Sequence, residues 1–211
     1  MHNSPFLIGL TADMTPTVAT AVESAISREL GDLADVRFEV MGGSPEVAAP
    51  EVADRYDAIL ALATRFPAGS FQGLTRLGII ARWGVGYDRI DVPACTEAGV
   101  LLAITPEAIR RPVAEGVFAL MFALTKRLLD LDRLTRSGEW RRNLPDNMIC
   151  IEGRSLGSVG MGNIAGEMFR MARGLNMGRL MAYAPYANPE TAKQLGVDLV
   201  SLEELLRESD F

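Results

Sequence analysis

Apolar and polar positions in the first hundred residues form short hydrophobic runs separated by amphipathic stretches. The hydrophobic runs lie at Phe6–Leu10, Val36–Val40, Ala58–Ala63, Leu77–Trp83 and Val100–Ile104. Each run has the length of a β-strand, and the near-continuous hydrophobicity of most of them indicates burial on both faces. Because helical patterns separate the runs, this half of the chain predicts a parallel sheet covered by helices on both sides.

Helix signals occupy the stretches between these strands. Pro16–Leu30 is predicted as a helix with Thr15 as its N-cap, because threonine caps and a proline at the first position are typical helix starts. A second helical stretch is expected from Pro45 to about Tyr56. A short third helix is expected to follow Asp91, whose carboxylate can cap it.

A long amphipathic helix is predicted in the middle of the chain, opened by Pro112 and ended by Gly138. Its apolar residues repeat at steps of three and four, as one face of an α-helix does. The repeating positions are Val113, Val117, Leu120, Met121, Leu124, Leu128 and Leu131. Ordinary core packing accounts for this stripe.

The last quarter of the chain again alternates strands with helices. The predicted strands are Leu156–Val159, Leu180–Tyr183 and Val197–Val200, and the predicted helices run from Asn163 to about Leu175, over Pro189–Leu195, and from Ser201 to about Glu208. Ser201 and Glu204 have the spacing of a capping box. Ser158 is an unusual polar member of an otherwise apolar strand.

Composition narrows the class of protein. The 211 residues are 48% hydrophobic, enough for a packed core, and the formal net charge of −6 argues against nucleic acid and anionic membranes as partners. Cys95 and Cys150 lie far apart without metal-ligand spacing, which favours a reducing cytoplasm over a disulfide framework. The longest apolar stretch, Val117–Leu124, is far too short to span a bilayer.

A glycine turn between a predicted strand and a predicted helix carries the clearest chemical signal. Gly160 permits the tight turn, Gly162 lets the backbone approach a pyrophosphate, and Ala165 is small enough for the helix to pack on the strand. The backbone N–H groups of Asn163 and Ile164 would then face the phosphates at the positive end of the helix dipole. This context predicts dinucleotide binding, with a simple helix-capping turn as the alternative.

One element of the dinucleotide pattern is missing. An acidic residue normally ends the second strand and binds the adenosine ribose 2′-hydroxyl, and here Ala184 occupies that position. Without a carboxylate, nothing repels the 2′-phosphate of NADP, and no arginine stands beside Ala184 to attract it. We therefore expect NAD as cofactor, with NADP not excluded and discrimination weak, so that either nucleotide is accepted or the affinity is low.

Several stretches together resemble the D-isomer-specific 2-hydroxyacid dehydrogenases, a family that includes the phosphoglycerate dehydrogenases. They are Arg82–Asp91, Thr105–Pro106, Val113–Glu115, Ser137–Trp140, Gly153–Ala165, Ala182–Tyr183 and Glu208–Phe211. The resemblance covers almost the whole chain, and it is much more specific than the glycine turn alone.

The resemblance implies an α/β fold in two parts. A flavodoxin-like parallel-sheet lobe, residues 1–104, would be the N-terminal part of the substrate lobe. An incomplete Rossmann lobe, residues 105–211, would be the first half of the nucleotide-binding domain. Members of the family are usually homodimers whose nucleotide domains pack together, so a homodimer is implied for a full-length protein, in the cytoplasm.

The implied reaction is hydride transfer between NAD(P) and C2 of a 2-hydroxy or 2-keto acid. In the family, backbone N–H groups matching Val85 and Gly86 hold the substrate carboxylate, although Gly84–Gly86 alone would also suit an ordinary strand-end turn. The catalytic arginine, glutamate and histidine of the family come later than Phe211, and His2 is expected to be a bystander. No catalytic residue is therefore expected in this chain, which alone should be inactive.

Other functions stay open on the sequence. Formate or phosphite dehydrogenation is a variant on the same fold. A non-catalytic module that binds a dinucleotide, or that pairs with a full-length relative through the long helix, is a second class. An inactive fragment or remnant is a third.

Overall fold

The computed structural model describes residues 5–33, 35–140 and 148–211. The chain divides into two compact units, Met1–Pro106 (unit 1) and Glu107–Phe211 (unit 2). No described helix is long and apolar enough to cross a membrane.

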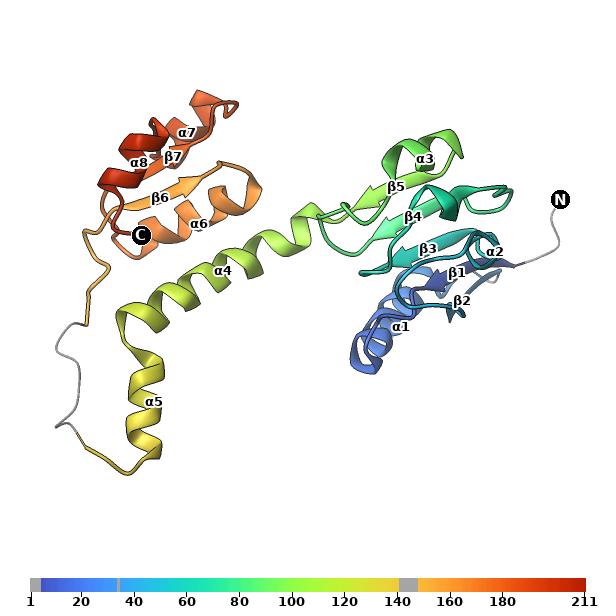
Figure 1. Ribbon diagram of the computed structural model, residues 1–211, viewed down its shortest axis with the longest axis horizontal. Helices are drawn as coiled ribbons and strands as arrows, with labels where there is room; N and C mark the ends of the chain where they lie inside the picture. The colour runs from blue at the N-terminus through green and yellow to red at the C-terminus, as the bar shows by residue number, and fades with distance from the viewer. Residues whose placement is uncertain (1–4, 34, 141–147) are drawn as a thin grey trace. The chain divides into compact units, whose positions relative to one another are not determined.

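Unit 1 is built on five parallel strands in the order β2-β1-β3-β4-β5 (Figure 1). The strands are β1 (Phe6–Leu10), β2 (Val36–Val40), β3 (Ala58–Ala61), β4 (Ile79–Arg82) and β5 (Leu101–Ile104). This order is that of flavodoxin-like sheets, so the fold class expected for this lobe is confirmed. The core between sheet and helices includes Tyr56, Ile59, Phe66 and Ile80, all fully buried.

The helices of unit 1 follow their capping signals, with one exception. In α1 (Pro16–Leu30) the Thr15 side chain accepts the N–H of Val18, and in α3 (Val92–Glu97) Asp91 accepts the N–H of Ala94. The predicted helix from Pro45 to Tyr56 is wrong. Only α2 (Pro50–Ala53) is α-helical there, because a residue before proline disfavours the α region and Ala49 is extended.

Two further segments connect the strands of unit 1. The segment before α2 lies alongside the chain after β3, with Val47 paired to Arg65. A 3₁₀ helix, η1 (Ala68–Phe71), continues that chain toward β4.

Unit 2 contains three parallel strands in the order β6-β7-β8. The strands are β6 (Leu156–Val159), β7 (Leu180–Tyr183) and β8 (Asp198–Leu199), and the helices that follow them are α6 (Asn163–Gly174), α7 (Pro189–Leu195) and α8 (Leu202–Glu208). If β6, β7 and β8 are counted as strands 1, 2 and 3 of the domain, the order from the other edge is 3-2-1, which is one half of a Rossmann sheet. Ser201 caps α8 by accepting the N–H of Glu204 at 3.1 Å.

The predicted long helix from Pro112 to Gly138 is two helices with different bounds. α4 (Pro106–Thr125) begins at Pro106 and carries Pro112 in its interior, and α5 (Leu128–Arg136) follows a left-handed residue, Arg127, with φ 51°. Pro112 costs α4 one backbone hydrogen bond. Next to it, the Arg111 side chain binds Glu115 at 2.6 Å and Glu167 of α6 at 3.1 Å.

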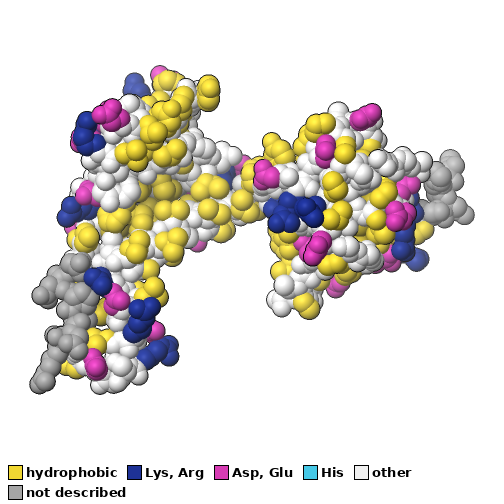
Figure 2. Space-filling view, in the orientation of Figure 1, with side chains coloured by type: hydrophobic (Ala, Val, Ile, Leu, Met, Phe, Trp, Pro, Cys, Tyr) yellow, Lys and Arg dark blue, Asp and Glu magenta, His cyan; other side chains and the backbone are white. Residues whose placement is uncertain are grey.

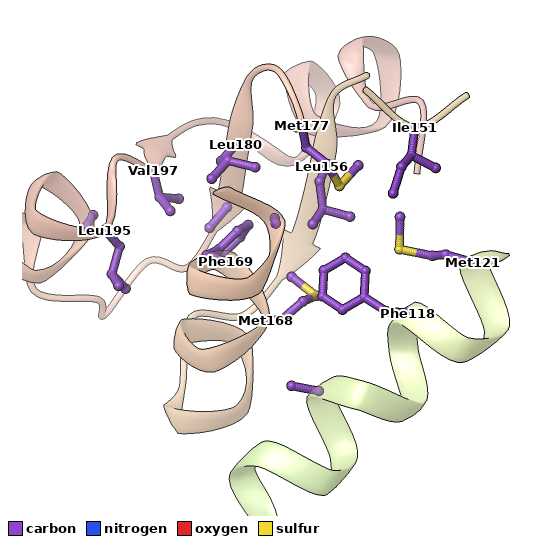
Figure 3. Packing of buried hydrophobic residues seen from close by; sticks show 14 residues of the cluster. Phe118, Met121, Ile151, Leu156, Met168, Phe169, Met177, Leu180, Leu195 and Val197 are labelled. Atoms are coloured by element: carbon purple, nitrogen blue, oxygen red, sulfur yellow. The ribbon is translucent and has the colours of Figure 1, made fainter. Parts of the chain in front are cut away.

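The core of unit 2 joins α4 to the sheet through α6 (Figure 3). Phe118 and Met121 of α4 pack with Met168 of α6 and Leu156 of β6. Part of the predicted stripe is therefore core. Leu120 and Leu124 on the same helix are 69% and 75% exposed, and Figure 2 shows hydrophobic side chains along α4.

The edge of β6 that faces away from β7 is joined by the last residues of the chain. Phe211 donates its N–H to Ser155 and accepts the N–H of Gly157, which is the hydrogen-bond pattern of a parallel ladder. Asp210 accepts the N–H of Ser155 at 2.8 Å and pairs with Arg154 at 3.0 Å. The hydrogen bonds from Ser155, with Arg154 adding to them, lower the pKa of the Asp210 carboxyl.

α8 packs closely on the opposite face of β6 from α6. A Cβ built on Gly157 would collide with Ser209 Oγ and lie 3.2 Å from Leu205 Cδ1. The Ser209 hydroxyl is held by the Leu205 carbonyl at 2.7 Å, so it cannot turn away without losing that bond. Gly157 is therefore required by packing rather than by backbone conformation.

Candidate dinucleotide and carboxylate sites

The glycine turn lies where β6 ends, beside the end of β7. Gly160 has φ +100°, a conformation that glycine alone adopts readily. Its N–H donates to the carbonyl of Tyr183 at 2.8 Å. The structure thus brings the turn next to Tyr183–Ala184, the segment where the ribose of a dinucleotide is expected.

The first turn of α6 presents unclaimed backbone donors. Gly162 is the N-cap of α6, and no side chain caps the helix there. The N–H groups of Asn163 and Ile164 belong to the helix start, where no intrahelical acceptor exists. A Cβ built on Gly162 would meet no atom within 4 Å, so the space above this turn is open. Ala165 packs against the hydrophobic core and lets α6 approach β6.

Ala184 follows β7 and opens a short turn. Its carbonyl accepts the N–H of Ala187 at 3.0 Å. The side chain is a half-buried methyl group, so this position offers neither an acceptor for a ribose hydroxyl nor a charge. The next residues, Pro185–Asn188, contain no basic side chain.

Ser158 makes a contact that the hydrophobic pattern does not reveal. Its hydroxyl donates to the carbonyl of Gly160 at 2.9 Å, inside the glycine turn. The role was missed in the sequence, although a polar residue in a buried strand was the signal that could have pointed to it.

The loop after β4 holds the two positions expected to bind a carboxylate. No hydrogen-bond acceptor is found for the backbone N–H groups of Val85 and Gly86 within the described residues. Gly84, just before them, has φ +135°, and both its N–H and its carbonyl form hydrogen bonds with Thr105. The Thr105 hydroxyl accepts the Gly84 N–H at 2.8 Å, and the Thr105 N–H donates to the Gly84 carbonyl at 2.9 Å.

Arg82, the last residue of β4, contacts this loop in a way that the sequence does not reveal. Its guanidinium donates to the carbonyl of Trp83 and lies against Gly84, where a Cβ would collide with it. A positive φ and this close approach both require glycine at position 84. The loop is therefore a rigid turn whose exposed amides resemble an anion-binding nest.

The described part of the chain holds neither a metal-binding cluster nor a histidine. No group of three or more histidine, cysteine, aspartate or glutamate residues that could hold a metal ion occurs there. His2, the one histidine of the sequence, lies outside the described residues.

Comparisons with known proteins agree with this geometry. Residues 118–211 match the NAD-binding domain of the D-isomer specific 2-hydroxyacid dehydrogenases. A glyoxylate reductase of Thermococcus kodakarensis is 37% identical over 172 residues, 79% of this chain and 51% of the relative. A D-3-phosphoglycerate dehydrogenase of Synechocystis sp. is 35% identical over 178 residues, 83% of this chain and 31% of the relative.

A solved structure gives the same result for the fold. The crystal structure of a glyoxylate reductase from Paecilomyes thermophila superposes with a TM-score of 0.75 at 27% identity, and the match covers 99% of this chain and 63% of that one. The α/β fold with its glycine turn is that of the NAD-binding domain that residues 118–211 match. The chain belongs to the D-isomer specific 2-hydroxyacid dehydrogenase family, and it spans about half the length of the glyoxylate reductases it matches.

Proposed function

We propose that the chain is the substrate-lobe and cofactor-turn portion of an NAD(P)-dependent D-2-hydroxyacid dehydrogenase. Unit 1 would supply the carboxylate-binding loop at Val85 and Gly86, and unit 2 would supply the first half of the dinucleotide site. The observation that carries the proposal is the glycine turn at Gly160–Gly162, placed between β6 and α6 and beside the end of β7.

The residues of the turn fit a dinucleotide. The open space above Gly162 and the uncapped start of α6 suit a pyrophosphate, which needs close backbone approach and N–H donors. When bound, a nicotinamide cofactor supplies the hydride chemistry of the reaction. Because Ala184 replaces the usual acid, we propose that NADH and NADPH are accepted with similar affinity.

The substrate we propose is a small 2-keto acid. The amides of Val85 and Gly86 would hold its carboxylate, since two converging N–H groups stabilise a planar anion. Glyoxylate is the first compound to test, because the relatives in the preceding comparison include glyoxylate reductases.

We expect the 211-residue chain on its own to show no turnover of glyoxylate with either NADH or NADPH. The described residues offer no histidine paired with a carboxylate, and such an acid–base pair is what the reaction needs. Loss of nicotinamide absorbance over time measures turnover, with a full-length glyoxylate reductase as positive control. Cofactor oxidation above the blank would contradict this expectation. Binding of NADH without turnover is the result that the proposal predicts for this chain.

We also propose that the protein is a homodimer formed through α4 and α5. Leu120 and Leu124 of α4 and Leu128 of α5 are more than half exposed, and neighbouring exposed hydrophobic side chains are a feature of interaction surfaces. Light scattering should give twice the monomer mass, and the double substitution Leu120→Glu and Leu124→Glu should give a monomer. A monomeric unsubstituted chain at micromolar concentration would contradict the proposal.

A further inference from the structure

Ser158 stands on the face of β6 that α6 covers. Side chains alternate along a strand, so Ser158 shares its face with Leu156, which packs among residues of α6 in the core of unit 2. Gly157, between them, faces Ser209 and Leu205 on the other side. A hydroxyl on the α6 face points toward the turn that joins β6 to α6, and there it reaches Gly160.

Gly160 is held by hydrogen bonds at both of its backbone groups. Its N–H donates to Tyr183 at 2.8 Å, and its carbonyl accepts the Ser158 hydroxyl at 2.9 Å. The first bond is made by backbone and would exist with any residue at position 183. The second bond requires a hydroxyl at position 158, so it depends on the serine that this chain has there.

The bond to Ser158 sets the direction of the next N–H. A trans peptide is planar, and its C=O and N–H point in opposite directions. Because the Gly160 carbonyl is turned toward Ser158, the N–H of Met161 is turned away from it. No acceptor for that N–H is found in the described part of the chain.

Glycine at position 160 makes this restraint necessary. Glycine allows wide ranges of φ and ψ, so the Gly160–Met161 peptide could rotate and exchange its two polar groups. A rotated peptide would place a carbonyl oxygen where an N–H now lies, and an oxygen lone pair repels phosphate. A donor fixed in advance binds an anion more tightly than one that must first be ordered.

We propose that Ser158 is a positioning residue of the dinucleotide site: its hydroxyl holds the Gly160 carbonyl so that the Met161 N–H, together with the N–H groups of Asn163 and Ile164, faces a phosphate. The inference rests on the proposed dinucleotide function and extends it to one side chain. It concerns the phosphate contact alone, so nucleosides without phosphate should not respond to a change at this position.

The test compares Ser158→Thr with Ser158→Val in the full 211-residue chain. The two side chains have the same shape, and both suit a strand, but only threonine carries a hydroxyl. Calorimetric titration with ADP should show wild-type affinity for the threonine variant. The valine variant should bind ADP about 5-fold more weakly, the value of one ordinary hydrogen bond. Adenosine should bind all three proteins equally.

The outcomes separate this inference from the function on which it rests. Equal ADP affinity for the threonine and valine variants would overturn the role of Ser158 while leaving the dinucleotide site intact. An equal loss of ADP and adenosine affinity in the valine variant would also overturn it, because that result indicates general damage to the lobe. Failure of the unsubstituted chain to bind ADP would overturn the dinucleotide site and this inference together.

Discussion

Replacing Gly162 by alanine is expected to weaken binding of NADH and ADP by roughly 10- to 100-fold while leaving the fold intact. The added methyl group would enter the space where the backbone must approach the pyrophosphate, and an overpacked contact costs on the order of 1–3 kcal/mol. The fold should tolerate the change because a Cβ at this position meets no protein atom within 4 Å. The backbone angles, φ −85° and ψ −168°, are also open to alanine.

Gly157→Ala is the matched control for this experiment. It adds the same methyl group five residues earlier, where Ser209 and Leu205 leave no room for it. We expect a loss of about 1–3 kcal/mol in the free energy of unfolding, measured by urea denaturation. For Gly162→Ala we expect less than about 1 kcal/mol, the scale of a changed N-cap.

Two results for Gly162→Ala would contradict the proposed dinucleotide site. If Gly162→Ala binds ADP as well as the unsubstituted chain, no phosphate lies against that residue. If it unfolds the chain as Gly157→Ala does, the open space seen in the structure is filled in solution. Either result would remove the main support for the dinucleotide function.

Ala184→Asp should turn weak cofactor discrimination into a clear preference for NADH. A carboxylate after β7 would accept a hydrogen bond from the ribose 2′-hydroxyl of NADH and repel the 2′-phosphate of NADPH. Hydrogen bonds to charged groups contribute about 1.5–3 kcal/mol, so we expect the ratio of the two dissociation constants to rise roughly 10- to 100-fold. Fluorescence titration with each reduced cofactor measures that ratio.

Ala184→Asn separates charge from shape in this experiment. Asparagine has nearly the same size as aspartate and can still accept a hydrogen bond, but it does not repel phosphate. It should therefore leave NADPH binding unchanged. A strong preference of the unsubstituted chain for NADH would contradict the proposal that Ala184 leaves the cofactors poorly distinguished. An unchanged ratio in Ala184→Asp would place the ribose elsewhere.

The strands and most helix starts could be predicted because their signals are local. Phe6–Leu10 and Leu180–Tyr183 were predicted with the bounds that the structure has, since buried parallel strands are continuous apolar runs. Val36–Val40 also has its predicted bounds, but it alternates apolar with charged residues and is the edge strand of its sheet. Capping residues such as Asp91 and Ser201 also act within one helical turn, so their function can be recognised from sequence.

The errors arose where local signals compete. Pro106 and Pro112 both suit the first turn of a helix, and the hydrophobic stripe does not decide between them, so the predicted helix starts at Pro112 instead of Pro106. The break at Arg127 depends on a left-handed conformation that arginine seldom adopts. Between Pro45 and Tyr56 the helical composition was outweighed by the proline at position 50.

The candidate site was predictable in its backbone parts and not in its side-chain restraints. Glycines and an uncapped helix start are visible in the sequence around Gly160. The bond from the Ser158 hydroxyl to Gly160 and the bond that the Thr105 hydroxyl accepts from Gly84 depend on side-chain rotamers and, for Thr105, on the pairing of β4 with β5. Such restraints become apparent only when the strands are in register.

The pairing of Phe211 with β6 bears on the order in which unit 2 folds. Ser155 and Asp210 are 55 residues apart, whereas β6 with β7 and β7 with β8 are joined by a single helical crossover each. Because the entropy lost on closing a loop grows with its length, we expect the three-stranded sheet to form first and the contacts of Asp210 and Phe211 last. Until then the backbone groups of Ser155 and Gly157 on this edge of β6 stay open, whereas the glycine turn is already held by Tyr183 and Ser158, so the cofactor turn would be formed before the sheet is completed.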